Sequence, residues 1–248
     1  MFATFEILQI CLVFFFAGLV KGILGLGLPT ISLTLLTVIF DLPSAMVLML
    51  LPSFITNLWQ AIEGESVTAV VKRHGIFFFF ATVSISIGSF LLVGQSTQLL
   101  PGLLGLLLVM YAISGIAGKS LKLTASSKGI ASIFGMVNGL LTGMTGSFVV
   151  PGVFYLQSIG LSRDAMVQAM GVLFTLSTLA LLLSLQGHQL IALSTALVSL
   201  TGVIPALLGM RIGRLTRQHI SAVRFKQIFY LALLVSGGYF IVKTSIGI

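Results

Sequence analysis

Two glycine-rich stretches hold the residues whose types and spacing are best suited to binding chemistry. The stretch KGILGLGLPT, at 21–30, contains a lysine, three glycines and a proline within a long apolar run. The stretch NGLLTGMTGS, at 138–147, has the same character later in the chain. Glycine lets the backbone turn and lets a ligand approach closely. A helix that restarts after such a break presents free N–H groups and the positive end of its dipole, which together can bind an anion.

The predicted anion site combines backbone and hydroxyl groups of both stretches with polar side chains nearby. Its members are Lys21, Gly25, Gly27, Thr30, Asn57, Asn138, Gly143, Thr145, Gly146 and Ser147. Lys21 could pair with the anion, or its aliphatic stem could carry the ammonium group to the membrane surface. Asn57 could line the pathway or bind neighbouring helices, and the glycines could serve only close helix packing.

The composition indicates which elements must position these residues. The chain of 248 residues is 57% hydrophobic and only 7% charged, whereas a soluble domain carries roughly a quarter charged residues. Several apolar runs reach the length of about 18 residues that is typical of membrane spans. We therefore expect an all-α polytopic membrane protein. The net charge of +8 is explained by basic residues in cytoplasmic loops, so a nucleic-acid partner is not expected.

The two stretches also look like counterparts in a duplicated chain. GLVKGILGLGLP, from Gly18, aligns with GMVNGLLTGMTG, from Gly135, and LPSAMV at 42–47 parallels LSRDAMV at 161–167. Broken segments at matching positions of two halves are typical of transporter binding sites. This predicts a first transmembrane repeat at 1–117, a cytoplasmic linker at 118–129 and a second repeat at 130–248. The alternative is a chance likeness between glycine-containing membrane helices.

The distribution of basic residues predicts how the breaks are built. The broken segments are 7–40, with its break expected at 22–29, and 130–158, with its break expected at 142–146. If each crosses the membrane once, the basic loops fall on opposite sides, against the positive-inside rule. If each is instead a hairpin with arms of about 14 residues, or 21 Å, most basic residues become cytoplasmic. These are Lys72, Arg73, Lys119, Lys122, Lys128, Arg163, Arg211, Arg214, Arg217, Arg224 and Lys226. Each half is then a hairpin plus three spans, so the repeats are inverted and both termini are periplasmic.

The residue types that are missing from the apolar segments argue against several functions. The five acidic residues and the histidines fall at segment ends, and Cys11 is the only cysteine. Proton relays, cation sites and intramembrane enzymes use such groups within the membrane. The sequence therefore predicts no catalytic residues, no metal site and no cofactor. The protein is not expected to be an enzyme. Export of an anion could be driven by the membrane potential alone, at about 2.3 kcal/mol per charge per 100 mV.

The sequence resembles the TauE/SafE family of sulfite exporters and related anion permeases. The likeness is carried by GLVKGILGLGLPT, DLPSAM, LPSFITNLWQAIEGE and LLGMRIGRLTRQHISAVRFKQIFYLALLVSGGYFIV. It implies transport of sulfite, sulfonates or other small organic anions across the bacterial inner membrane. Two departures are visible: Leu28 and Pro29 stand where further glycines are expected, and Met144 and Thr145 separate the glycines of the second box.

Two other functions remain open at this point. One is import of an organosulfur or carboxylate anion coupled to Na⁺ or H⁺, and the other is a membrane scaffold that transports nothing. The sequence leaves the identity of the anion open, and a homo-oligomer is compatible with it. The partners we expect are therefore a small anion and the lipid bilayer.

Overall fold

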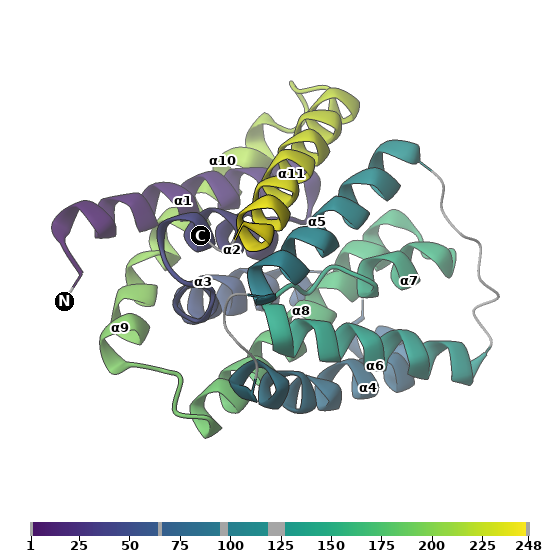
Figure 1. Cartoon of the computed structure of the whole chain (residues 1–248). Helices are drawn as coiled ribbons and strands as arrows, with labels where there is room; N and C mark the ends of the chain where they lie inside the picture. The colour runs from purple at the N-terminus through teal and green to yellow at the C-terminus, as the bar shows by residue number, and fades with distance from the viewer. Residues whose placement is uncertain (1, 64–65, 95–98, 119–126, 247–248) are drawn as a thin grey trace. The chain divides into compact units, whose positions relative to one another are not determined.

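The computed structural model describes residues 2–63, 66–94, 99–118 and 127–246, and every regular element in these ranges is an α-helix (Figure 1). The helices are α1 Thr4–Leu24, α2 Leu28–Ile39, α3 Leu42–Ile62, α4 Val67–Gly94, α5 Leu99–Ala117, α6 Lys128–Thr145, α7 Gly152–Ser158, α8 Arg163–Gly187, α9 Leu193–Thr201, α10 Val203–Thr216 and α11 Ala222–Ser245. Seven stretches of the described residues are long and apolar enough to cross a membrane, and α9 with α10 forms one of them. The predicted all-α polytopic membrane fold is confirmed.

The helices pack into two compact units. Unit 1 comprises residues 1–52, 95–119 and 191–248, and unit 2 comprises residues 53–94 and 120–190. Each unit therefore draws helices from both predicted repeats, and α3 contributes to both because the boundary follows Pro52. The division into repeats stays a prediction. Most of the predicted linker at 118–129 lies outside the described residues.

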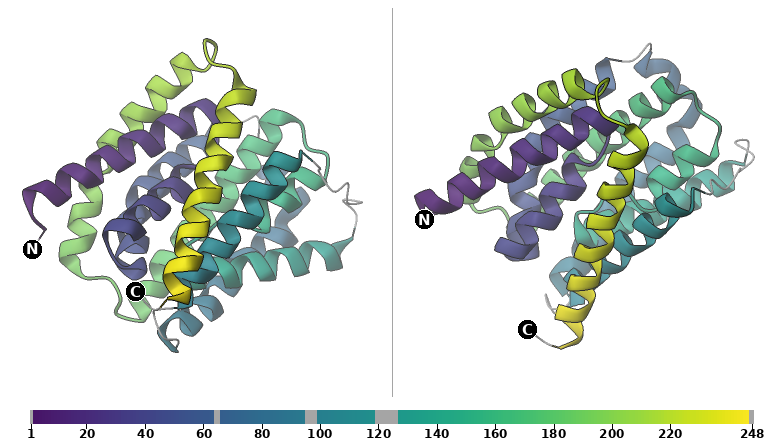
Figure 2. Two further views of the ribbon diagram at one scale, coloured as in Figure 1. Left: turned by 45° about the horizontal axis from the view of Figure 1, so that its top comes forward. Right: turned by 90° about the horizontal axis from the view of Figure 1, so that it is seen from above.

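In unit 1, α1 lies along α10, and Figures 1 and 2 both show the two helices side by side. Gly18 faces the backbone of Ala206 and Gly22 faces the backbone of Met210, with no room for a β-carbon at either glycine. Small residues of this kind let membrane helices approach backbone to backbone. Because the two contacts advance together along both helices, α1 and α10 run parallel and end at the same end of the unit.

The described basic residues of unit 1 gather largely at that end. α5 runs antiparallel to α11, since Gly102 lies against Thr244 and Gly115 against Tyr230. α11 begins shortly after α10 ends, so the end of α5, the end of α1 and the start of α11 all share one end of the unit. The basic residues there are Arg211, Arg214, Arg217, Arg224 and Lys226.

Unit 2 is built on a second parallel pair, α4 and α6. Gly135 lies against Phe77 and Gly139 lies against Ala81, again with contacts to backbone atoms. Both contacts advance together, so the two helices begin at the same end of unit 2. The pairing resembles that of α1 with α10, since each unit joins the first helix of one predicted repeat to the last-but-one span of the other.

The second broken segment returns to the end of unit 2 where it started. A cavity is lined jointly by residues from 66–74, where α4 begins, and from 161–168, where α8 begins. Gln60 Nε2 also donates to the carbonyl oxygen of Val167 over 2.8 Å. Because α6 begins at the same end as α4, the chain leaves this end along α6 and is back at it when α8 begins. A single crossing would have put Arg163 at the opposite end.

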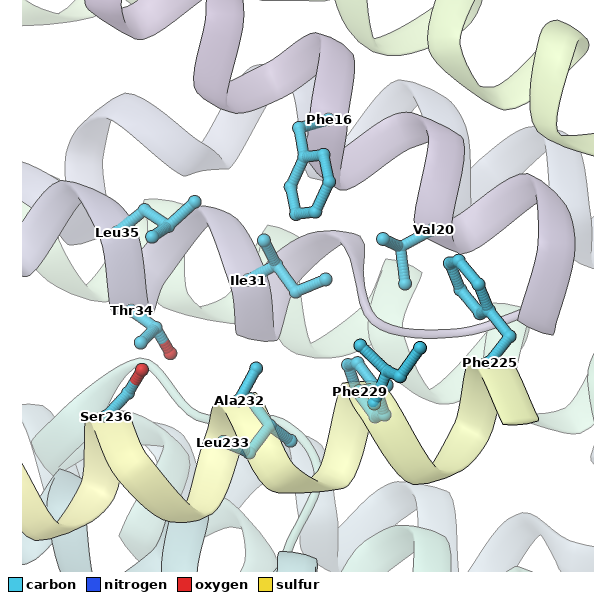
Figure 3. A pocket seen from close by; sticks show the side chains of 11 residues that line it. Phe16, Val20, Ile31, Thr34, Leu35, Phe225, Phe229, Ala232, Leu233 and Ser236 are labelled. Atoms are coloured by element: carbon cyan, nitrogen blue, oxygen red, sulfur yellow. The ribbon is translucent and has the colours of Figure 1, made fainter. Parts of the chain in front are cut away.

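The first broken segment also reverses direction. In Figure 3 the chain runs one way from Phe16 to Val20 and the opposite way from Ile31 to Leu35. The arms, however, are unequal: α1 has 21 residues and α2 has 12, while α6 has 18 and α7 has 7. The expectation of about 14 residues per arm was therefore wrong. The first arms are long because they pack along α10 and α4 over most of their length.

α3 contains a proline in its interior, and a second helix compensates for it. Pro52 has no N–H group, so it leaves the carbonyl oxygen of Leu48 without its usual intrahelical donor. Ser199 Oγ of α9 donates to that oxygen over 2.6 Å, and both residues are fully buried. The irregular point of α3 is thus stabilised from within unit 1.

Candidate functional site

The first break consists of three residues between α1 and α2. Gly25 has φ 79° and ends α1, and its N–H donates to the carbonyl oxygen of Lys21 over 2.7 Å. Gly27 has φ 108° and starts α2. Both values lie in the left-handed region that only glycine occupies readily. A β-carbon on Gly27 would also lie 3.3 Å from Phe229 Cε2, so this turn depends on glycine for conformation and for space.

The start of α2 presents unused backbone donors. The N–H of Ile31 donates to the carbonyl oxygen of Gly27 over 2.8 Å, and Pro29 has no N–H. The N–H groups of Leu28 and Thr30 have no acceptor within the described ranges. Since Thr30 is only 3% exposed, the first break offers a buried helix N-terminus of the kind that binds anions.

The second break begins later than predicted. A break was expected at 142–146, but Thr142 to Thr145 are helical and the chain leaves α6 at Gly146, with φ 72°. The reason is packing: Gly143 lies against the backbone of Ile85 in α4, a contact that a regular helix provides. One glycine of the box therefore serves packing and the other serves the turn.

Side chains of the second break bond to its own backbone. Thr145 Oγ1 donates to the carbonyl oxygen of Leu141 over 2.7 Å and accepts from the N–H of Ser147 over 3.2 Å. Thr142 Oγ1 donates to the carbonyl oxygen of Ser147 over 2.9 Å. The hydroxyl of Thr145 and the N–H of Ser147, both predicted to bind the anion, are thus engaged within the protein in this structure.

Asn138 holds the two arms of the second break together. Its Oδ1 accepts from the N–H of Gly152, the first residue of α7, over 2.8 Å. Asn138 is fully buried, and its Nδ2 has no hydrogen-bond partner among the described residues. The sequence predicted Asn138 as a substrate contact but did not indicate this bond, which supports the hairpin directly.

Lys21 and Asn57 are both buried. Lys21 is 3% exposed, which excludes the alternative in which its stem carries the ammonium group to the surface. It precedes Gly25 by one turn, and Arg214 is close enough to interact with it electrostatically. Asn57 is fully buried in the part of α3 that belongs to unit 2.

The structure therefore brings the predicted site residues into two groups. Lys21, Gly25, Gly27 and Thr30 lie together in unit 1. The remaining six belong to unit 2, and five of those lie in or beside the second break, namely Asn138, Gly143, Thr145, Gly146 and Ser147. That the two groups share one ligand stays a prediction.

Sequence reasoning missed a reciprocal contact between α3 and α8. Gln60 Nε2 donates to the carbonyl oxygen of Val167 over 2.8 Å, and Gln168 Nε2 donates to that of Ala61 over 3.0 Å. Gly171 allows the approach, because a β-carbon there would lie 2.6 Å from the nitrogen of Ala61. Gly171, one turn after Gln168, was the one sequence signal for this contact. Its partner Ala61 lies in the other predicted repeat, so the sequence did not show which helix it contacts.

A cavity of about 130 Å³ lies beside the first break in unit 1 (Figure 3). It is lined by α1, α2 and α11, and its walls are mostly aliphatic and aromatic, with Phe16 and Phe229 among them. Its two hydroxyls are those of Thr34 and Ser236, and Thr34 Oγ1 already donates to the carbonyl oxygen of Thr30 over 2.7 Å. The lining carries no charged side chain, so this cavity does not suit an anion.

The model of the family described as sulfite exporter TauE/SafE matches residues 10–240. No similar curated protein and no similar solved structure was found. The match covers nearly the full chain and agrees with seven apolar stretches long enough to span a membrane. The chain therefore belongs to the TauE/SafE sulfite exporter family of membrane transporters.

Proposed function

We propose that this transporter exports a small anion, sulfite or an organosulfonate, down the membrane potential by alternating access, and that the anion binds at the first break. The observation that carries the proposal is the burial of Lys21, 3% exposed and one turn before Gly25. Glu6, Asp41, Glu63 and Asp164, the carboxylates that the structure describes, all lie outside the buried interior. We therefore expect the interior near the first break to favour an anion, whose negative charge would stabilise the ammonium form of the buried Lys21.

The local chemistry suits an oxyanion. The ammonium group of Lys21 supplies a positive charge, and the N–H groups of Leu28 and Thr30 supply donors at a helix N-terminus. Hydrogen bonds from charged and oriented donors to an anion are stronger than neutral ones, and they strengthen further where water is excluded. The second break, whose side chains already bond to its own backbone, is not part of this proposed site.

The proposed topology has inverted repeats in a bacterial inner membrane with both termini periplasmic. It is supported by two observations, the return of the second broken segment to its starting end and the gathering of basic residues at one end of unit 1. Single cysteines placed at Arg73, Arg214 and Ala3 in a Cys11→Ser background test it. The first two should react with an impermeant maleimide only after permeabilisation, and the third should react in intact cells. Labelling of Arg73→Cys and Arg214→Cys from opposite sides would overturn the topology.

Transport is tested with purified protein in proteoliposomes loaded with sulfite. A potential imposed by a K⁺ gradient and valinomycin should change the final sulfite ratio by about 50-fold per 100 mV for a monoanion. Efflux that ignores the potential but follows an imposed Na⁺ gradient would refute export by the potential and favour the coupled importer.

Two variants test the role of Lys21. Lys21→Gln keeps a side chain that can donate hydrogen bonds but removes the charge, so the KM for sulfite should rise at least tenfold while the protein stays folded. Lys226→Gln removes an exposed cation from the same end of unit 1 and should leave the KM unchanged. Equal effects of the two substitutions would show that general charge, and not a binding contact, is what matters.

A further inference from the structure

A second cavity, this one with a polar lining, lies in unit 2. It has a volume of about 310 Å³ and is formed where α4 and α8 begin. Its buried lining includes His74 and Gln168, while Arg73, Ser162 and Asp164 are exposed around it. In binding sites for small molecules, a few convergent polar or charged groups fix the orientation of the ligand and provide specificity.

His74 is the group in this cavity that points to a ligand. It is 6% exposed, and its Nε2 has no hydrogen-bond partner among the described residues. Its backbone departs from the helix, with φ −120° and ψ 18°, so α4 bends at this residue. Buried polar atoms are nearly always hydrogen-bonded, and a ligand in the cavity would complete the bonding of this nitrogen.

Two opposite charges line the same cavity. Arg73 and Asp164 make no ion pair with each other or with any other residue in the described ranges. Asp164 lies in the first turn of α8, where a carboxylate is favourable by itself. Ser162 Oγ accepts from the N–H of Ala165 over 3.3 Å and keeps its own proton to donate. The cavity thus offers one cation, one anion and, among its other polar groups, those of His74 and Ser162.

We propose that this cavity binds a small zwitterion, with an acid group and an ammonium group joined by a short apolar spacer. The acid group bonds to the guanidinium of Arg73 and to His74 Nε2, and the ammonium group bonds to the carboxylate of Asp164. Ala69, Val70 and Ala165 provide the apolar wall for the spacer. A simple anion is repelled by Asp164 and a simple amine is repelled by Arg73, so the pair of charges selects a ligand that carries both.

The experiment compares three probes of similar size on the full-length protein in detergent: β-alanine, propionate and propylamine. Titration calorimetry should show that β-alanine binds at least tenfold more tightly than either of the others. Asp164→Asn should lower β-alanine affinity at least tenfold and remove its advantage over propionate. His74→Gln should weaken both β-alanine and propionate. Lys72→Gln, which removes a neighbouring exposed cation outside the cavity lining, should change nothing.

Equal affinity of the three probes, or β-alanine binding that is unchanged in Asp164→Asn, would overturn the proposal. Each variant is first checked for an unchanged helical circular dichroism spectrum. If Asp164→Asn fails this check, Arg73→Gln replaces it and should leave propylamine binding at least as tight as β-alanine binding. No transport assay is involved, so the result is independent of whether sulfite export proves correct.

Discussion

Ser199→Ala should destabilise the protein because it removes the hydroxyl that replaces the N–H group missing at Pro52. The serine hydroxyl donates to the carbonyl oxygen of Leu48, to which Pro52 cannot donate because it has no N–H group. Both Ser199 and Leu48 are fully buried. Loss of the hydroxyl leaves a buried acceptor without a donor, which lowers the free energy of unfolding by about 1–3 kcal/mol. Most of this loss of stability comes from leaving the buried carbonyl oxygen unsatisfied, and less of it from the lost hydrogen bond itself.

A double-mutant cycle separates these two contributions. In the Pro52→Ala background the new N–H at position 52 can donate to the Leu48 oxygen, so Ser199→Ala should then lower the free energy of unfolding by only about 0.5–1 kcal/mol. The coupling between the two sites should therefore be about 1–2 kcal/mol. Thr201→Ala is the matched control, because this α9 hydroxyl bonds to Val198 of its own helix and is exposed.

The assay is equilibrium unfolding in mixed micelles with increasing mole fraction of SDS. Trp59 is the single tryptophan and lies in α3 with Pro52, so its fluorescence reports on the helix in question, and circular dichroism reports on all helices. An effect of Ser199→Ala that is the same in both backgrounds would refute the reasoning, since it would show that the serine does not act through the missing N–H.

Two further predictions follow from buried contacts in unit 2. Gly139→Ala should lower the free energy of unfolding by about 1–3 kcal/mol, because its β-carbon would lie 2.5 Å from the carbonyl oxygen of Ala81. Gly238→Ala in α11 is the control, because a β-carbon there has nothing within 4 Å, and it should raise the free energy of unfolding by up to about 1 kcal/mol. Equal effects of the two substitutions on thermal unfolding would contradict the packing role of Gly139. Asn138→Leu should cost about 1–3 kcal/mol by orphaning the N–H of Gly152 and should speed proteolysis near α7, and unchanged protection there would show that this bond does not hold the arms.

The fold class and the existence of both breaks could be predicted from the sequence, because apolar length and glycine content are local signals. The position of the second break could not. Gly143 and Gly146 look alike in the sequence, and only the contact of Gly143 with Ile85 shows which one must stay helical. Composition likewise could not predict the arm lengths, since α1 continues to Leu24 through its packing on α10.

The roles of individual polar residues were the least predictable part of the candidate site. Asn138 bonds to Gly152, 14 residues away, and Gln168 bonds to Ala61, 107 residues away. A sequence pattern shows that such a residue is costly to bury, but it does not show which backbone group satisfies it. Lys21 is a different case, because its burial speaks against the surface alternative while its contact with the anion stays a prediction.

The parallel pairing of α1 with α10 has a consequence for how the protein is made. The glycine face of α1 meets a partner that begins only at Val203. At about 5–20 residues per second, the ribosome needs roughly 10–40 s to reach α10 after it completes α1. Unit 2 is complete once residue 190 has been synthesised, whereas unit 1 waits for 191–248. α1 therefore enters the membrane well before its partner exists, and a chain truncated before α10 would leave the glycine face of α1 exposed to lipid or to proteases.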